Sequence, residues 1–355
     1  MDKQIIKSYV FNILAIILIF VLLKILIATG ILSRYYIGIV IFIGINIILA
    51  TSLNLATGFL GQLALGHAGF MAVGAYASAI TAIALKPTFL PYLESLFPPI
   101  LILGFIPIGF IPGLIVLLIS LVVAGIFAGI VGIVIGIPAL RLRGDYLGII
   151  TLGFGEVIRV FINNMKALTG GAQGLTGIPR ISNFDNVFWI TVIVVGILYT
   201  LTHSRQGRAI ISIREDEIAA ESVGINTTKY KVMGFAIAAF FAGIGGGLYA
   251  HYIAFLDPNT FNFMRSVEIL VIVVLGGMGS LTGSVVAAIV LTILPEALRD
   301  FANFRLLIYS GLLVIMMIFR PQGIFGTSEF SMSEFIHKIK HNQIFSPGKE
   351  VKEGK

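Results

Sequence analysis

The sequence predicts an all-α, polytopic integral membrane protein, and three observations support this fold class. The chain has 355 residues, of which 57% are hydrophobic, and its mean hydropathy is +1.02, whereas roughly 45–50% of the residues in a soluble domain are apolar. Apolar runs of about 20 residues, the length of a membrane-spanning helix, recur along most of the chain. No cysteine is present, which excludes a disulfide framework and a thiolate metal site, and we predict no bound metal.

Hydropathy and turn signals divide the chain into about ten crossings, within a range of about 8–10. Residues 8–30 follow Lys3 and Lys7 as the apolar part of a signal peptide would. We interpret them as a retained helix, because they lead directly into another apolar segment. The later crossings are predicted at 35–55, 59–84, 112–138, 145–163, 187–203, 230–252, 265–279, 280–298 and 304–320.

Two stretches fit this pattern poorly. Residues 98–113 are apolar but interrupted by prolines, which indicates a re-entrant or interfacial piece rather than a straight helix. Residues 265–279 are short for a crossing and run into the glycine-rich sequence GGMGSLTG. We therefore consider a half-helix as the alternative to a full crossing there.

The distribution of Lys and Arg predicts the orientation. If the N-terminus is cytoplasmic, most of the basic residues fall in the inside segments, so both termini and residues 204–231 are predicted to face the cytoplasm. This distribution explains the net charge of +7 without nucleic acid as a partner. Residues 327–355 are polar and Lys-rich, which predicts a cytoplasmic tail with some affinity for anionic lipid headgroups.

Residues 204–231, SRQGRAIISIREDEIAAESVGINTTKYK, form a polar island in this apolar chain. Residues 215–217, all acidic, begin a short helical window and Gly224 ends it. One interpretation is a solvated loop. The other is a docking knob, in which Ala219 and Ala220 permit close approach and flanking charges fix the register on a soluble partner. The charges are Arg205, Arg208, Arg214, Glu215, Asp216, Glu217, Glu221, Lys229 and Lys231.

Several segments together resemble a known family. They are SLNLATGFLGQLALGHAGFMAVGAY (52–76), LRLRGDYLGIITLGFGEVIR (140–159), TGGAQGLTGIP (169–179), SRQGRAIISIREDEIAAESVGI (204–225), VLGGMGSLTGS (274–284) and FRPQGIFG (319–326). In this order they resemble the branched-chain amino-acid permeases of ATP-binding-cassette (ABC) importers, of the LivM type in the LivH/LivM pair. REDEIAAESVG is similar to the cytoplasmic coupling helix of such permeases.

The resemblance implies a transmembrane permease domain at 1–326, in a prokaryotic cytoplasmic membrane, for Leu, Ile and Val or alternatively for urea or another small amide or amino acid. It implies a LivH-like second permease, two ATPase subunits and an extracytoplasmic binding protein as partners. The sequence has no GxxxxGK[ST] phosphate loop, so ATP and Mg²⁺ would bind the ATPases and this chain would do no chemistry. The coupling residues would be Arg214, Glu215, Asp216, Glu217, Ala219, Ala220, Glu221 and Gly224.

Polar residues inside the crossings are candidates for the translocation path. Glu156, Arg159 and Asn163 share one helix face, and an Arg at the bilayer centre costs roughly 2.5–3.5 kcal/mol, so this face must meet protein or water. The competing interpretation is a Glu156–Arg159 ion pair that holds helices together. A second polar set is Asn46, Asn54, Gln62 and His67, of which His67 is more typical of a packing residue.

Glycines mark the surfaces where helices approach closely or unwind. The candidates are Gly58, Gly61, Gly66, Gly69, Gly125, Gly129, Gly132 and Gly136. The glycine-rich sequences LATGFLGQLALG and LGGMGSLTGS also suggest a weak internal symmetry around a central path.

Two other classes of protein remain alternatives. An ion-coupled secondary carrier would use Glu156 or Glu268 as its proton or sodium site, but would leave the polar island unexplained. An intramembrane enzyme is disfavoured, because the sequence has neither an HExxH pattern nor a recognisable pairing of nucleophile and base.

Overall fold

The computed structural model describes residues 3–87, 91, 101–102, 106–107, 111–142 and 144–299, and a few positions between 310 and 326. Its contacts divide the chain into two units, residues 1–34 with 329–355 and residues 35–328. Within the first unit the structure describes α1 (Lys3–Ala28). The predicted tail at 327–355 and most of the predicted crossing at 304–320 lie outside the described residues.

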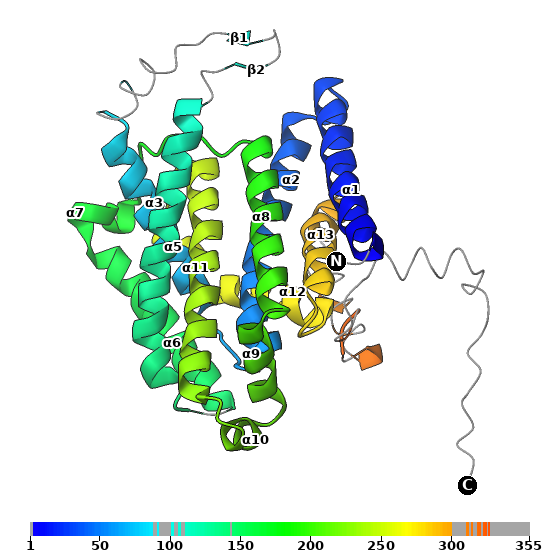
Figure 1. Cartoon of the computed structure of the whole chain (residues 1–355). Helices are drawn as coiled ribbons and strands as arrows, with labels where there is room; N and C mark the ends of the chain where they lie inside the picture. Colours follow the sequence, from blue (N-terminus) through cyan, green and yellow to red (C-terminus); the bar gives the residue numbers. More distant parts are fainter. Residues whose placement is uncertain are drawn as a thin grey trace. The chain divides into compact units, whose positions relative to one another are not determined.

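The second unit is built almost entirely of helices (Figure 1). Residues 101–102 and 106–107 form a short antiparallel pair, β1 (Leu101–Ile102) and β2 (Ile106–Pro107), and the rest of 98–110 lies outside the described residues. The elements of the helical part are α2 (Arg34–Asn54), η1 (Leu55–Phe59), α3 (His67–Leu85), α5 (Ile111–Ala139), α6 (Asp145–Asn164), α7 (Lys166–Thr169), η3 (Gly171–Gln173), α8 (Phe184–Thr202), α9 (Arg205–Glu215), α10 (Glu217–Ser222), α11 (Thr227–Ile253), η4 (Pro258–Phe261), α12 (Phe263–Gly276) and α13 (Leu281–Ala297).

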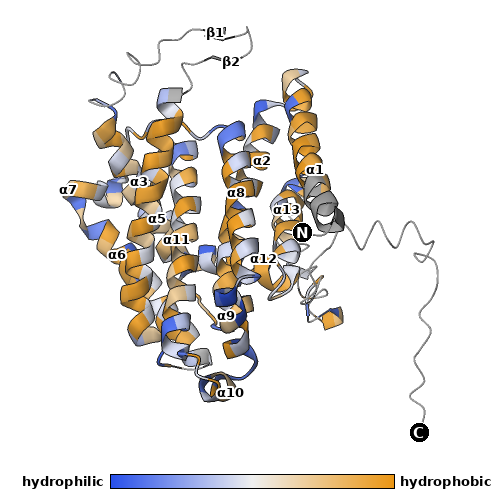
Figure 2. Cartoon of the chain, in the orientation of Figure 1, coloured by the Kyte–Doolittle hydropathy of each residue, from blue (hydrophilic) through white to orange (hydrophobic). Residues whose placement is uncertain are grey.

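Within the described part of the chain, 6 helical segments are long and apolar enough to cross a membrane. They are Arg34–Phe59, His67–Leu85, Pro112–Ala139, Tyr146–Asn164, Phe184–Thr202 and Thr227–Ile253. In Figure 2 these segments are coloured mostly as hydrophobic, whereas hydrophilic residues gather around α9 and α10. The prediction of a multi-pass helical membrane protein is therefore confirmed, while the ten-helix count and the positions of the termini stay predictions.

The centre of the second unit is the packing of α11 against α3 and α5. Small residues allow these helices to approach: Gly243 of α11 lies against Ala124 and Ala128 of α5, and Gly74 of α3 lies against Gly243. Without side chains at these points, backbones come into direct contact, as is common where transmembrane helices pack. This contact fixes the frame on which the other elements are placed.

The predicted crossing at 59–84 is wrong at its start. Helix α2 continues into η1, a π-helical turn, and residues 60–66 are not helical before α3 begins at His67. Gly61 explains this first break, because its φ of +72° cannot continue a right-handed helix. The amide of Gln62 then donates to the carbonyl of Ala56 at 2.9 Å and closes the end of the helix.

A second break separates α12 from α13. Helix α12 has 14 residues, which at 1.5 Å per residue gives about 21 Å, short of a hydrocarbon core of about 30 Å. Gly277 and Gly279 follow with φ values of +110° and +91°, and the Ser280 hydroxyl caps α13 by accepting from the amide of Gly283 at 3.0 Å. The short α12 corresponds to the alternative of a half-helix.

Candidate functional site: the α9–α10 segment and the paired helix breaks

The polar island folds into two short helices, α9 and α10, between α8 and α11 at one end of the bundle (Figure 1). Ser204 caps α9, with its hydroxyl accepting from the amide of Gly207 at 3.1 Å. Asp216 has an extended backbone, so it ends α9 and caps α10 by accepting from the amides of Ile218 (2.9 Å) and Ala219 (3.0 Å). Gly224 follows α10 with a φ of +86°. The chain therefore defines α10 at both ends through its own residues.

Two carboxylates of α10 are engaged within the chain. Glu217 forms an ion pair of 2.6 Å with Lys231 of α11, whose side chain is 5% exposed. The hydroxyl of Thr227 donates to Glu221 at 2.7 Å, and Ala220 is buried. In the docking-knob interpretation these charges fix the register on a partner, and within the chain both carboxylates also hold α10 against α11.

The open surface at α10 carries two large apolar side chains beside the exposed Glu221 and Ser222. The exposed fractions of Ile218 and Val223 are 74% and 76%, and Ala219 is also exposed. These residues lie on a polar segment outside the membrane-spanning helices, where an apolar surface is typical of a protein contact. The sequence analysis missed Ile218 and Val223, because it considered only the charged residues and the alanines of this segment. These two large apolar residues lie between Asp216 and Gly224, and that position could have identified them.

Asn54 joins the two helix breaks. Its amide nitrogen donates to the carbonyl of Ser280 and to the hydroxyl of Ser284, each at 2.8 Å, and its carbonyl oxygen accepts from the amide of Gly279 at 2.9 Å. All of these groups are buried. The two glycine-rich sequences that suggested internal symmetry are therefore in direct contact.

The Glu156–Arg159 face meets the segment before α12. The two side chains form an ion pair of 2.7 Å and are about one-third exposed, at 32% and 28%. Glu156 also accepts from the amide of Phe263 at 3.0 Å, and Arg159 donates to Asn259 at 3.0 Å. These bonds correspond to the interpretation in which the pair holds helices together. The buried carbonyl oxygen of Asn163 has no hydrogen bond with any described residue.

The second polar set does not form one cluster. Asn46 donates to Thr292 at 2.9 Å and accepts from Arg265 at 2.7 Å, which ties α2 to α12 and α13. His67 is buried and bonds Ser52 at 2.9 Å, as expected of a packing residue. The half-buried Gln62 lies in the first break, and Glu268, the other candidate ion site of a carrier, pairs with Arg265 at 2.9 Å. The described residues contain no group of three or more potential metal ligands.

The candidate glycines fall into two groups. Gly58, Gly61 and Gly66 lie at the first break, whereas the others lie within helices and face neighbouring ones. A Cβ on Gly132 would lie 2.6 Å from that of Ala239, but one on Gly129 would make only ordinary contacts at 3.6 Å. The remaining neighbours are Thr151 for Gly66, Gly155 for Gly69, Phe240 for Gly125 and Phe235 for Gly136.

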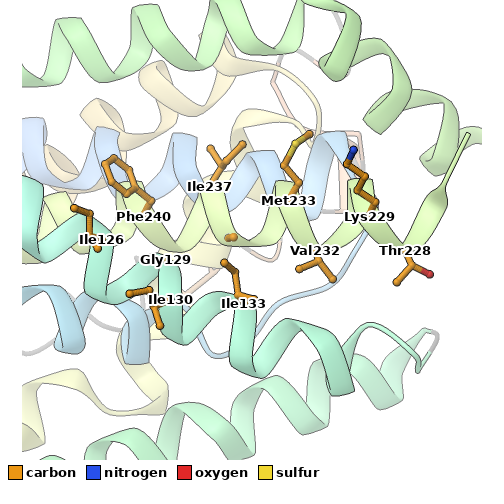
Figure 3. Close-up of a pocket in the computed structure, with 11 residues that line it drawn as sticks. Ile126, Gly129, Ile130, Ile133, Thr228, Lys229, Val232, Met233, Ile237 and Phe240 are labelled. Carbon is orange, nitrogen blue, oxygen red and sulfur yellow. The ribbon is translucent and has the colours of Figure 1, made fainter.

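An apolar groove of about 560 Å³ lies between α5 and α11 (Figure 3). Ile126, Ile130 and Ile133 line one side, and Phe240 lines the other. Thr228 and Lys229 lie at its end, close to α10. The groove contains no cluster of polar groups, so it offers no catalytic arrangement.

Comparisons with known proteins agree with this architecture. The sequence profile of the family described as "Branched-chain amino acid transport system / permease component" matches residues 35–320. The LivM permease proteins of the high-affinity branched-chain amino acid transport systems of Salmonella typhimurium and Escherichia coli K12 are each 35% identical over 306 residues, covering 77% of this chain. The LivH permease protein of Escherichia coli K12 is 27% identical over 185 residues, covering 51% of this chain and 59% of its own length.

The match to the two LivM proteins spans 65% of their length. No solved structure is significantly similar to the chain. The profile nevertheless covers most of the second unit, including α10 and both helix breaks. The chain therefore belongs to the family of permease components of branched-chain amino acid transport systems.

Proposed function

We propose that this chain is the transmembrane permease subunit of a binding-protein-dependent ABC importer for branched-chain amino acids. The observation that carries the proposal is the family match across residues 35–320. The α9–α10 segment supports it, because a permease that is driven by separate ATPases needs a contact surface outside the membrane. With Ile218 and Val223 exposed on a well-anchored helix, α10 has this form.

The proposed complex contains this chain, a LivH-like second permease, two ATPase subunits that bind ATP and Mg²⁺, and an extracytoplasmic binding protein. Support for the second permease is that LivM and LivH proteins both match this chain. Leu, Ile and Val are the proposed substrates, and selectivity would rest largely with the binding protein. Asn46, Asn54, Gln62, His67, Glu156, Arg159 and Asn163 are candidates for the path, although most of them are hydrogen-bonded to other helices.

Docking of the ATPase is tested by placing a charge at the exposed apolar residues of α10 and its C-cap, Ile218 and Val223. Ile218→Asp and Val223→Asp, separately and together, should release the ATPase from the purified complex and abolish uptake of radiolabelled leucine, since an ionised carboxylate cannot be buried against an apolar surface without a partner. Gln206→Asp is the matched control, because it adds the same charge at an exposed position of α9.

Co-purification from native membranes and uptake into proteoliposomes are the measurements. A wild-type chain that purifies without an ATPase and transports under an ion gradient would contradict the importer. Uptake of urea in preference to leucine by the intact complex would change the substrate and leave the mechanism in place.

A further inference from the structure

The side chain of Arg214 points away from the proposed docking face and into the junction of the two helix breaks. One terminal nitrogen of its guanidinium donates to the carbonyl of Gly58 at 2.9 Å. A Cβ on Gly61 would lie 2.8 Å from Arg214 Cγ, and one on Gly279 would lie 2.7 Å from that same terminal nitrogen. Arg214 therefore occupies a notch that is open because residues 61 and 279 have no side chains, and it bonds the backbone of Gly58 there.

The notch lies where the first and second breaks touch each other. Gly58 belongs to the π-helical turn η1, and a Cβ there would overlap the Asn54 side chain and the amide of Gly279. Asn54 in turn bonds Gly279 and Ser280, so a shift of Arg214 against either break is transmitted to the other. Both glycines 61 and 279 have positive φ, which makes them the points where the backbone direction changes.

The first break departs from regular α-helical geometry and leaves one buried polar group unsatisfied. π-Helical turns are rare and occur mostly as local distortions, frequently at functional sites. The Thr57 hydroxyl within this turn is buried and has no hydrogen-bond partner among the described residues, and an unsatisfied buried hydroxyl is destabilising. A rearrangement that gave this hydroxyl a partner would relieve part of that destabilisation.

Arg214 is also close to α10 along the chain. It pairs with Glu215, the last residue of α9, and Asp216 directly follows as the cap of α10. Any displacement of α10 relative to α11 therefore reaches Arg214 through two residues. The Glu217–Lys231 pair ties α10 to α11. Among the described hydrogen bonds, the one from Arg214 to Gly58 connects this segment to the paired breaks.

We propose that Arg214 is a positioning residue that transmits displacement of α10 to the paired breaks at Gly58 and Gly279, and so couples ATP hydrolysis to opening of the path. This inference rests on the proposed function. It assigns to Arg214 a role distinct from ATPase docking: the residue acts inside the permease, on helices α2, α3, α12 and α13, and does not contact the substrate.

The test compares Arg214→Gln with Arg208→Gln in the purified, reconstituted complex. Arg208 is the matched control, because it is an exposed arginine on the same helix whose hydrogen bond among the described residues goes to the local carbonyl of His203. Arg214→Gln should retain the ATPase on co-purification and continue to hydrolyse ATP, with at least a tenfold fall in leucine taken up per ATP hydrolysed. Arg214→Lys should recover uptake only in part, because lysine lacks the planar fork of donors. Arg208→Gln should leave the ratio unchanged.

A distance measurement keeps the proposal testable if uptake is lost for another reason. The chain has no cysteine, so Gln62→Cys and Met278→Cys allow two spin labels to be placed, one in each break region. Addition of a non-hydrolysable ATP analogue should change the label separation in the wild-type background and leave it unchanged in Arg214→Gln. An equal change in both backgrounds, or an unaltered uptake ratio in Arg214→Gln, overturns the proposal. Failure of the wild-type chain to bind an ATPase instead overturns the proposed function.

Discussion

At the scale of single residues, two charges of the α9–α10 segment pair with each other, although the sequence alone did not indicate this pairing. Glu217 and Lys231 are far enough apart in the chain that nothing in the local pattern pairs them, yet they form an ion pair in which the lysine is almost fully buried. Sequence reasoning located the segment and its helix boundaries. It could not separate inward from outward charges, because that depends on how α10 folds back on α11.

Loss of the Glu217 carboxylate should destabilise this segment more than loss of an exposed one. Glu217→Ala leaves the Lys231 ammonium buried without this partner and should lower the stability of the segment by about 3 kcal/mol. Hydrogen exchange of residues 217–231 in detergent would measure this. Glu215→Ala, at a side chain that is 66% exposed, is the control.

The double variant Glu217→Ala with Lys231→Met should recover most of the lost protection, because no uncompensated charge stays buried. Equal exchange rates in Glu217→Ala and in the wild type would show that the ion pair contributes nothing to the anchoring of α10.

At the scale of elements, hydropathy located most of the helices, since α5, α6, α8 and α11 lie within a few residues of their predicted ranges. It missed the break before α3, because residues 60–66 are as apolar as the helices around them. A window of mean hydropathy reports whether a segment prefers lipid or protein to water. It does not report the local backbone geometry that Gly61 and the π-helical turn impose.

The contact between α5 and α11 allows a prediction with a control on the same helix. Gly132→Ala places a methyl group 2.6 Å from the Ala239 Cβ. Overpacking costs about 1–3 kcal/mol and the gain in helix propensity returns about 1 kcal/mol, so the melting temperature should fall. Gly129→Ala meets only ordinary contacts and should raise it or leave it unchanged. A higher melting temperature for Gly132→Ala would mean that the helices are not in close contact there.

At the scale of the whole molecule, the membership of a permease family and the multi-pass helical architecture confirm the class that composition and hydropathy predicted. The resemblance rested on six segments that occur in a fixed order along the chain. The roles of individual polar residues were harder to predict. Asn46 and Asn54 make their contacts with residues more than two hundred positions away along the chain, and no periodicity in one helix reveals such partners.

The orientation of the chain is testable with single cysteines in the natural cysteine-free background. Val223→Cys, exposed on α10, should react with a membrane-impermeant maleimide only in inverted vesicles, because the basic residues predict that this segment is cytoplasmic. Gln173→Cys, in the exposed connection before α8, should react only in right-side-out vesicles. The opposite pattern would reverse the predicted topology.

The notch around Arg214 also has a consequence for how this sequence can change over time. Positions 58, 61, 214 and 279 constrain one another sterically, because a side chain at position 61 or 279 would meet the arginine and one at position 58 would meet Asn54 and the Gly279 amide. In a saturation mutagenesis library selected for growth on a limiting amino acid, these four positions should form one block of intolerance. Loss of the arginine should not restore tolerance at positions 61 and 279, because their positive φ strains any residue with a side chain whatever the space around it.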